Sequence, residues 1–191
     1  MILLPNGKVV SQEQAKQGWP IFRMGFRPFF FFGSLFGLIS IMVWVLAFTG
    51  NIAFTPLNGT LFWHTHEMVF GFTTTIIAGF LLTAVQNWTG FVTIKGKALG
   101  ALVLLWITAR VLLAIDLNLP SILIMLIDLA FLPTVALCIG LAIFKAKKWR
   151  NLFFVPVLLI MTILNALMYA SAFDKIDMSY LSISYIMVLM V

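Results

Sequence analysis

Long apolar runs separated by short polar loops dominate the pattern of this chain. An α-helix needs roughly 20 apolar residues to cross the hydrocarbon core of a bilayer. Five runs approach or exceed this length, and they cover residues 29–48, 68–85, 98–115, 119–144 and 152–173. A sixth run begins near residue 178 and is still apolar at residue 191, where the sequence stops. The pattern predicts an all-α polytopic membrane protein with five complete transmembrane helices and a truncated sixth.

The basic residues predict how these helices are oriented. Ten of the twelve lie before the first run, after the second or after the fourth: Lys8, Lys16, Arg23, Arg27, Lys95, Lys97, Lys145, Lys147, Lys148 and Arg150. The loops on the opposite side contain only Lys175, and Arg110 lies within the third run. Because lysine and arginine in short loops stay in the cytoplasm, we expect the N-terminus inside. Residues 1–28 are then a cytoplasmic segment, and residues 29–191 form a transmembrane helical domain.

Composition supports the membrane class and excludes others. The chain is 62% hydrophobic and 9% charged, whereas soluble domains are about 45–50% apolar and about 25% charged. The net charge of +6 does not indicate a nucleic-acid partner, because the basic residues lie in short loops where an orientation signal explains them. The single Cys138 lies inside an apolar run, so the chain has neither an intrachain disulfide nor a zinc-type cysteine spacing. We expect the lipid bilayer as the principal partner, and the sequence leaves the oligomeric state open.

Residues 63–71 (WHTHEMVFG) hold both histidines of the chain and lie at the predicted outer end of the second run. A spacing of two places His64 and His66 about 200° apart on a helix, so they face one centre only if the stretch is extended. Glu67 shares a helical face with His64 and is placed to hold the second ring nitrogen of a ligating histidine. Neutral imidazole suits haem iron and copper. The histidines are therefore either metal ligands or residues wetted at the membrane interface.

Three further polar residues are predicted at related depths in the outer half of the bilayer. At 1.5 Å per residue, Arg110 lies about 9 Å below the outer end of its helix, and Asp128 and Asn165 lie about 14 Å below theirs. Charges inside a membrane are costly and mark functional sites when they occur. We expect one polar pocket open toward the outer face, in which Arg110 and Asp128 form a structural ion pair.

Several motifs together resemble a known family. They are GFRPFF at residues 25–30, WHTHEMVFGF at 63–72, IAGFLLTAVQNWTG at 77–90, DLAFLP at 128–133 and RN at 150–151. Their order and spacing are similar to the N-terminal half of the NnrS family of haem- and copper-containing membrane proteins. The resemblance covers nearly the whole chain and implies that it corresponds to about half of a twelve-helix family architecture.

The resemblance implies a multi-pass protein of the bacterial inner (cytoplasmic) membrane that takes part in the response to nitric oxide, in denitrification or nitrosative stress. It also implies haem and copper as cofactors, and nitric oxide or a related small molecule as a partner. Matched residue by residue, His64, His66 and Glu67 correspond to the family's histidine motif, with the two histidines as metal ligands. Arg27 and Asn87 correspond to its flanking motifs and are further pocket candidates. Whether the protein is an enzyme, which haem it binds and which histidine binds which metal stay open.

One position departs from the family pattern. Tyr169 stands four residues after Asn165, where the resemblance leads us to expect a histidine. Tyrosine can ligate haem iron, but the loss of a ligand is the simpler interpretation. Both residues are kept as pocket candidates. Two other functions are compatible with the residues: a proton- or ion-coupled transporter that uses a buried His, Glu, Arg and Asp relay, and a bis-histidine electron carrier.

Overall fold

The computed structural model describes residues 2–3, 9–10 and 19–173. The sixth apolar run and Lys175 lie outside the described residues. Near the N-terminus, strands β1 (Ile2–Leu3) and β2 (Val9–Val10) pair antiparallel, and a 3₁₀ turn, η1 (Pro20–Arg23), leads into the first long helix.

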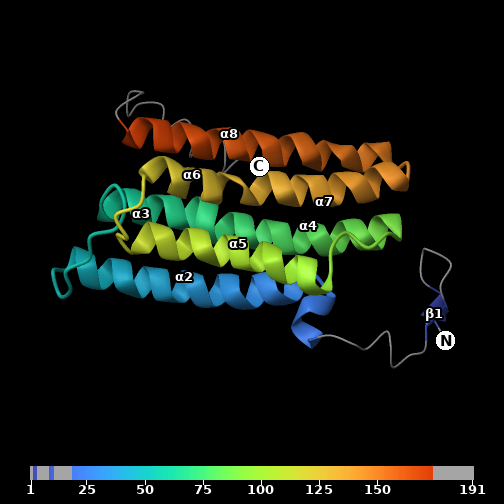
Figure 1. The fold of residues 1–191 in the computed structure, drawn as a ribbon, viewed down its shortest axis with the longest axis horizontal. Coiled ribbons are helices and arrows are strands. Elements are labelled where there is room, and N and C mark those ends of the chain that lie inside the picture. Colours follow the sequence, from blue (N-terminus) through green and yellow to red (C-terminus); the bar gives the residue numbers. More distant parts are fainter. Residues whose placement is uncertain (1, 4–8, 11–18, 174–191) are drawn as a thin grey trace.

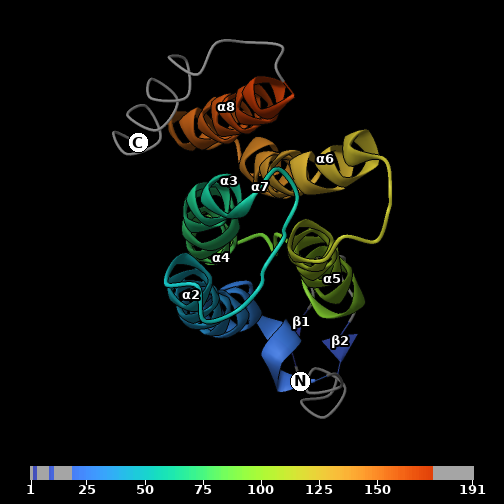
Figure 2. The ribbon, with the colours of Figure 1, turned by 90° about the vertical axis from the view of Figure 1, so that its left-hand side faces the viewer.

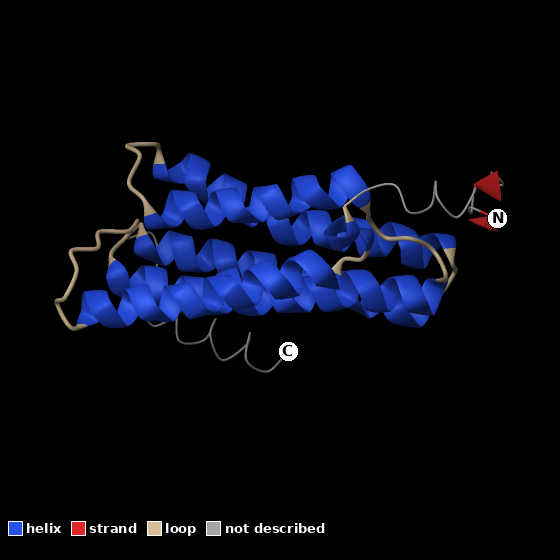
Figure 3. Cartoon of the chain, turned by 90° about the horizontal axis from the view of Figure 1, so that it is seen from below, coloured by secondary structure: helices blue, strands red, loops and turns tan. Residues whose placement is uncertain are grey.

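The rest of the described chain consists of helices joined by loops and turns (Figure 3). Its elements are α2 (Phe26–Phe48), α3 (Thr60–His66), the π-helical segment η2 (Glu67–Thr73), α4 (Thr74–Thr89), α5 (Gly96–Ala114), α6 (Ser121–Leu129), α7 (Phe131–Lys145), the 3₁₀ turn η3 (Trp149–Phe153) and α8 (Phe154–Ala172).

These elements join into five helices that are long and apolar enough to cross a membrane. They are Phe26–Phe48, Thr60–Thr89, Gly96–Ala114, Ser121–Lys145 and Trp149–Ala172. They run lengthwise beside one another in Figure 1. The prediction of an all-α, multi-pass membrane protein with five spans is thus confirmed for the described residues. The inward N-terminus and the boundary between residues 28 and 29 remain predictions.

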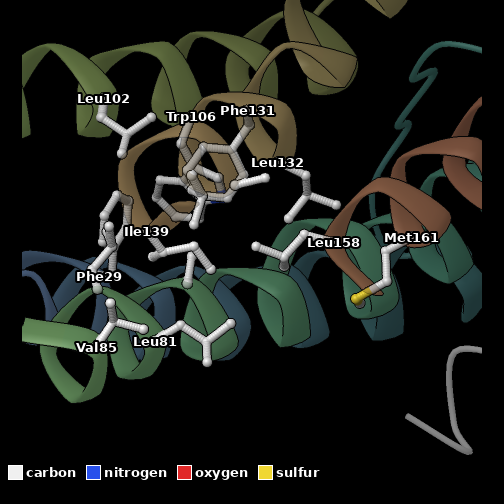
Figure 4. Close-up of a cluster of buried hydrophobic side chains, with 14 of the residues drawn as sticks. Phe29, Leu81, Val85, Leu102, Trp106, Phe131, Leu132, Ile139, Leu158 and Met161 are labelled. Atoms are coloured by element: carbon white, nitrogen blue, oxygen red, sulfur yellow. The ribbon is translucent and has the colours of Figure 1, made fainter. Parts of the chain in front are cut away.

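α4 and α7 occupy the middle of the bundle. α4 packs against α2 on one side and α7 on the other, and α7 packs in turn against α8 (Figure 2). Figure 4 shows side chains from these helices meeting in one apolar core, among them Phe29 of α2, Leu81 of α4, Ile139 of α7 and Leu158 of α8.

Small residues bring α2 and α4 together. A Cβ atom on Gly79 of α4 would lie 2.9 Å from Cβ of Phe29, and one on Gly33 of α2 would lie 3.0 Å from Cγ2 of Thr75. Helices in a membrane associate by such close packing, because lipid is as apolar as the side chains that it would replace. The two glycines therefore allow the backbones of α2 and α4 to pack closely against each other.

The two ends of the bundle differ in charge. The basic residues of the described chain apart from Arg110 lie in or next to η1, the α4–α5 loop and the α7–η3 loop, toward the right-hand end of the bundle in Figure 1. α3, α6 and the C-terminal end of α8 lie at the other end. The residues of the predicted outer pocket belong to this second, less basic end.

Candidate functional site

The site begins at a change of helix geometry. Between α3 and α4, the segment Glu67–Thr73 is π-helical, with Glu67, Phe70 and Gly71 buried. The Thr73 hydroxyl donates to the carbonyl of Met68, five residues earlier, at 2.8 Å. A π-helical turn widens the helix, and such turns are frequent at functional sites. Here it interrupts the 3.6-residue period immediately after His66.

A side chain from another helix supports this turn. Trp106 of α5 donates its indole N–H to the carbonyl of Gly71 at 3.0 Å. Backbone carbonyls inside a membrane need a partner within the protein, since lipid offers none. Trp106 thus ties α5 to the π-helical segment.

A buried arginine joins two carboxylates from different helices. Arg110 of α5 donates from Nη1 to Oε2 of Glu67 at 2.8 Å, and from Nη2 to Oδ1 of Asp128 in α6. The exposed fractions of the three residues are 5%, 0% and 4%. Removing one member of such a cluster leaves an uncompensated buried charge, which is strongly destabilising. The cluster therefore fixes η2, α5 and α6 relative to one another.

His66 completes the cluster from the last turn of α3. Its Nε2 lies 2.9 Å from Oδ1 of Asn165 and 3.2 Å from Oδ2 of Asp128, and its Nδ1 lies 3.3 Å from Oε1 of Glu67. Asn165 donates its Nδ2 to Oδ2 of Asp128 at 2.8 Å. Because a carboxylate can only accept, this bond directs the amide oxygen of Asn165 toward His66, and Nε2 of the imidazole must carry the proton.

The remaining nitrogen, Nδ1, lies 3.3 Å from Oε1 of Glu67. With a neutral imidazole and both carboxylates ionised, His66, Glu67, Arg110 and Asp128 carry one net negative charge, which is costly in an apolar interior. One added positive charge beside Nδ1 and Glu67 would make the four side chains neutral.

Aromatic rings enclose His66. Phe62 is stacked with its ring at a centroid distance of 5.5 Å, Phe70 lies at 5.5 Å, and Tyr169 packs edge-on at 5.1 Å. Tyr169 also donates its hydroxyl to Oδ2 of Asp128 at 3.3 Å. The imidazole is fully buried as a result.

His64 has a different environment. Its ring is stacked on Trp44 of α2 with a centroid distance of 4.0 Å, and its buried Nδ1 has no hydrogen-bond partner among the described residues. The structure therefore separates the two histidines. The sequence had associated Glu67 with His64, but the carboxylate contacts His66 and Arg110 instead.

The structure thus gathers six of the sequence-predicted residues around one centre, at one end of the bundle: His66, Glu67, Arg110, Asp128, Asn165 and Tyr169. Arg27 and Asn87 lie near the other end, in the first turn of α2 and the last turns of α4. Arg27 donates there to the carbonyl of Pro20 at 3.0 Å. The sequence did not identify Trp44 and Trp106 as residues of the site, because both lie inside apolar runs and nothing else distinguishes them.

The donor set fits a metal in part. Among the described residues no three or more His, Cys, Asp or Glu side chains are grouped as a metal site. Both ring nitrogens of His66 have protein partners, so it fits as a ligand only after giving one of them up. The unpartnered Nδ1 of His64 is the one imidazole nitrogen of the described chain that is buried and free to bind a metal.

These features define a multi-pass helical membrane protein with a buried ionic cluster at one end of its bundle. Residues 20–191 match the family model described as NnrS protein, and the chain belongs to the NnrS family. This confirms the resemblance drawn from the sequence motifs. No curated protein and no solved structure matches the chain.

Proposed function

We propose that this chain belongs to a haem- and copper-binding protein of the bacterial inner membrane that takes part in the response to nitric oxide. Membership of the NnrS family over residues 20–191 is the observation that carries the proposal. The buried cluster around His66 supports it, because charged groups are retained inside a membrane bundle mainly where function requires them.

His64 is the residue that we propose as a metal ligand in the described chain. Its Nδ1 is buried without a partner, and a buried polar atom without a hydrogen bond is costly unless something binds it. Haem or copper held by His64 would supply a metal centre to which nitric oxide binds. Trp44, stacked on the imidazole, fixes the plane of the ring.

His66 has a second role in this proposal. Its Nδ1 faces the Glu67 carboxyl group, while Asn165 accepts a hydrogen bond from Nε2–H. If His66 ligated copper, Nδ1 would be the nitrogen that binds the metal, with Glu67 beside it. Asn165 would then orient the imidazole through the other ring nitrogen, as hydrogen-bond acceptors do for ligating histidines.

The proton- or ion-coupled transporter is the less favoured alternative. The cluster does contain the His, Glu, Arg and Asp side chains that such a relay uses. However, family membership does not favour transport, and aromatic side chains surround His66 in the described structure.

The proposal is tested with the full-length protein purified in detergent, by visible absorption spectroscopy and metal analysis. We expect haem and copper to co-purify, and His64→Ala to remove one of them. His66→Ala is expected to lower the content of the other, and Glu67→Gln to weaken that site without abolishing it. Asn87→Ala, at the opposite end of the bundle, is the control and should retain both.

Two results would overturn the proposal. Folded protein that shows neither a haem band nor copper would exclude both metal functions. Unchanged metal content in both histidine variants would place the metal ligands outside residues 60–89.

A further inference from the structure

A groove on the outside of the bundle runs between α7 and α8. Its volume is about 410 Å³, and every residue that lines it is apolar or glycine. The lining includes Leu137 and Phe144 of α7 and Leu159 of α8, with exposed fractions of 61%, 64% and 43%. Both helices belong to segments that are long and apolar enough to cross a membrane, so the groove is open to lipid.

A basic loop joins α7 to α8 at one end of this groove. It follows the groove residue Phe144 directly and contains four cations, all of them exposed: Lys145, Lys147, Lys148 and Arg150. Unlike a charge inside the bundle, these side chains are accessible to a ligand that lies along the outside of α7 and α8. The groove and the loop therefore offer one apolar and one cationic surface next to each other.

Backbone hydrogen bonds keep the loop tight. Only residues 146–148 separate α7 from η3. Lys147 has a φ of 54°, and the N–H of Lys148 donates to the carbonyl of Ile143 at 3.2 Å, as in the turn that commonly ends a helix. The N–H of Asn151 donates to the carbonyl of Lys148 at 2.9 Å and continues the chain into the next helical turn. The cations thus stay at the end of the groove.

The described chain has no carboxylate at this end of the bundle. Its three acidic residues, Glu67, Asp116 and Asp128, belong to η2, the α5–α6 loop and α6, toward the opposite end in Figure 1. An exposed lysine is stable in water alone, but several cations without a nearby carboxylate form a positive surface that attracts anions. The basic loop is therefore complementary to an anionic partner.

Trp149 indicates the depth of the loop in the membrane. Its ring is 55% exposed and packs edge-on against Phe144 with a centroid distance of 5.3 Å. Indole rings favour the boundary between hydrocarbon and headgroups. From Phe144 back to Pro133, the groove extends along α7 for about 17 Å at 1.5 Å per residue, and one leaflet of hydrocarbon is about 15 Å thick. The groove therefore has the length of an acyl chain, and the loop lies at the level of its headgroup.

From these observations we infer that the groove and the basic loop together bind an anionic phospholipid. One acyl chain lies between α7 and α8, and the phosphate lies against the cations of the loop. Basic residues next to membrane helices bind anionic headgroups in this way. A zwitterionic lipid is disfavoured, because its ammonium group would lie near the same cations. The inference involves no metal, so it holds or fails separately from the function proposed above.

The α4–α5 loop provides an internal comparison. Lys95 and Lys97 are exposed there, and they lie toward the same end of the bundle as the α7–η3 loop. Neither of them lines the groove, and neither do residues of α4 or α5. Both loops can serve as orientation signals, but only the α7–η3 loop adjoins the groove. Lipid binding at the site should therefore depend on one loop and not on the other.

Tryptophan fluorescence tests the inference on the full-length protein, delipidated in an uncharged detergent. Phosphatidylglycerol with brominated acyl chains is the probe, since bromine quenches an indole only at short range. The Trp149→Phe variant, which keeps an aromatic ring, is measured in parallel, and its signal is subtracted to isolate Trp149. We expect saturable quenching of Trp149, and half-saturation at a lower concentration for brominated phosphatidylglycerol than for brominated phosphatidylcholine.

Two double variants with the same change in charge test the role of the loop. Lys147→Gln with Lys148→Gln should raise the half-saturating concentration roughly 5- to 30-fold, because each basic residue near a headgroup contributes several-fold to binding. Lys95→Gln with Lys97→Gln is the control and should leave it unchanged. All four lysines are exposed, so both variants should unfold at the temperature of the parent protein.

Four outcomes would overturn the inference. Equal quenching by phosphatidylcholine would mean that the groove takes lipid without selecting its headgroup. Equal losses in the two double variants would assign the effect to the general charge of this end of the bundle. Competition by glycerol phosphate at the same concentration as phosphatidylglycerol would identify a site for free phosphate. No quenching of Trp149 by either lipid would show that another part of the protein or a second copy covers the groove.

Discussion

Asn165 Oδ1 lies 2.9 Å from Nε2 of His66, although 99 positions separate the two residues in the chain. The contact joins α8 to α3, and the Nδ2 of the same amide donates a hydrogen bond to Asp128 of α6. A single amide thus determines the protonated nitrogen of the imidazole and connects three helices.

Replacing Asn165 by Leu should destabilise the fold. The change leaves the Nε2–H of His66 without its closest acceptor and takes a donor from Asp128, and each stranded buried group costs roughly 1–3 kcal/mol. Thermal unfolding followed by circular dichroism measures the effect. Asn87→Leu is the matched control, because Asn87 lies outside the cluster. Equal losses in the two variants would show that the amide contacts contribute nothing specific.

Arg110→Met should be more damaging than Asp128→Leu. Loss of the guanidinium leaves two carboxylates without their countercharge, whereas loss of Asp128 leaves Arg110 paired with Glu67. Breaking a buried pair typically costs about 3–5 kcal/mol. The amount of folded protein and its melting temperature are the measurements. The double variant should lose less than the sum of the two single losses, and strict additivity would argue against direct coupling.

Gly71→Ala should disturb the ionic cluster from the backbone side. A Cβ atom there would collide with Oε2 of Glu67 and lie 2.6 Å from Nη1 of Arg110. Overpacking of this kind costs roughly 1–3 kcal/mol. Gly100→Ala in α5 is the control, because its Cβ would meet Phe22 at 3.9 Å, an ordinary contact. The two melting temperatures should differ clearly, and similar values would mean that the cluster shifts freely to accommodate the methyl group.

Tyr169→Phe should leave the visible spectrum unchanged. The phenol hydroxyl donates to Asp128 and lies in the packed interior, so it is engaged as a hydrogen-bond donor rather than available as a haem ligand. The ring, which packs on His66, is retained in the variant. We expect a loss of stability of about 0.5–1.5 kcal/mol, the usual contribution of one hydrogen bond. A shifted or missing haem band would identify Tyr169 as a ligand.

Membrane orientation is tested by single cysteines in a Cys138→Ser background. Cysteines at Lys97 and Lys148 should resist a membrane-impermeant thiol reagent in intact cells, and one at Asn58 should react, since basic loops stay in the cytoplasm. All three positions are exposed, so failure to react reports the side of the membrane and not burial. The reverse labelling pattern would place the ionic cluster near the inner face.

The membrane spans could be predicted from the sequence, because hydropathy determines which segments enter the bilayer. The start of the second helix could not be predicted from hydropathy, since this helix begins at Thr60 and not at Met68. Polar side chains such as His66 continue the helix because they find partners inside the bundle. A hydropathy profile reflects the polarity of these side chains, but it contains no information about their hydrogen-bond partners in the folded protein.

The composition of the cluster was only partly accessible from the sequence. Arg110, Asp128 and Asn165 have similar predicted depths in the membrane, because a helix rises uniformly along its axis. The contact of Glu67 with Arg110 could not be predicted in this way, since a 3.6-residue period associates Glu67 with His64. The π-helical segment that begins at Glu67 breaks that period. The sequence pattern does not predict this π-helical segment.

The sharing of one guanidinium among three helices has a consequence for how the chain is made. Arg110 is synthesised 43 residues after Glu67 and 18 residues before Asp128, while Asn165 follows 37 residues after Asp128. Each helix therefore leaves the ribosome with a polar group whose counterpart is on another helix. Glu67 gains its countercharge only when α5 is inserted, and Arg110 gains its second carboxylate with α6, so we expect the early helices to stay associated during insertion, with α8 adding the neutral side chain of Asn165 last.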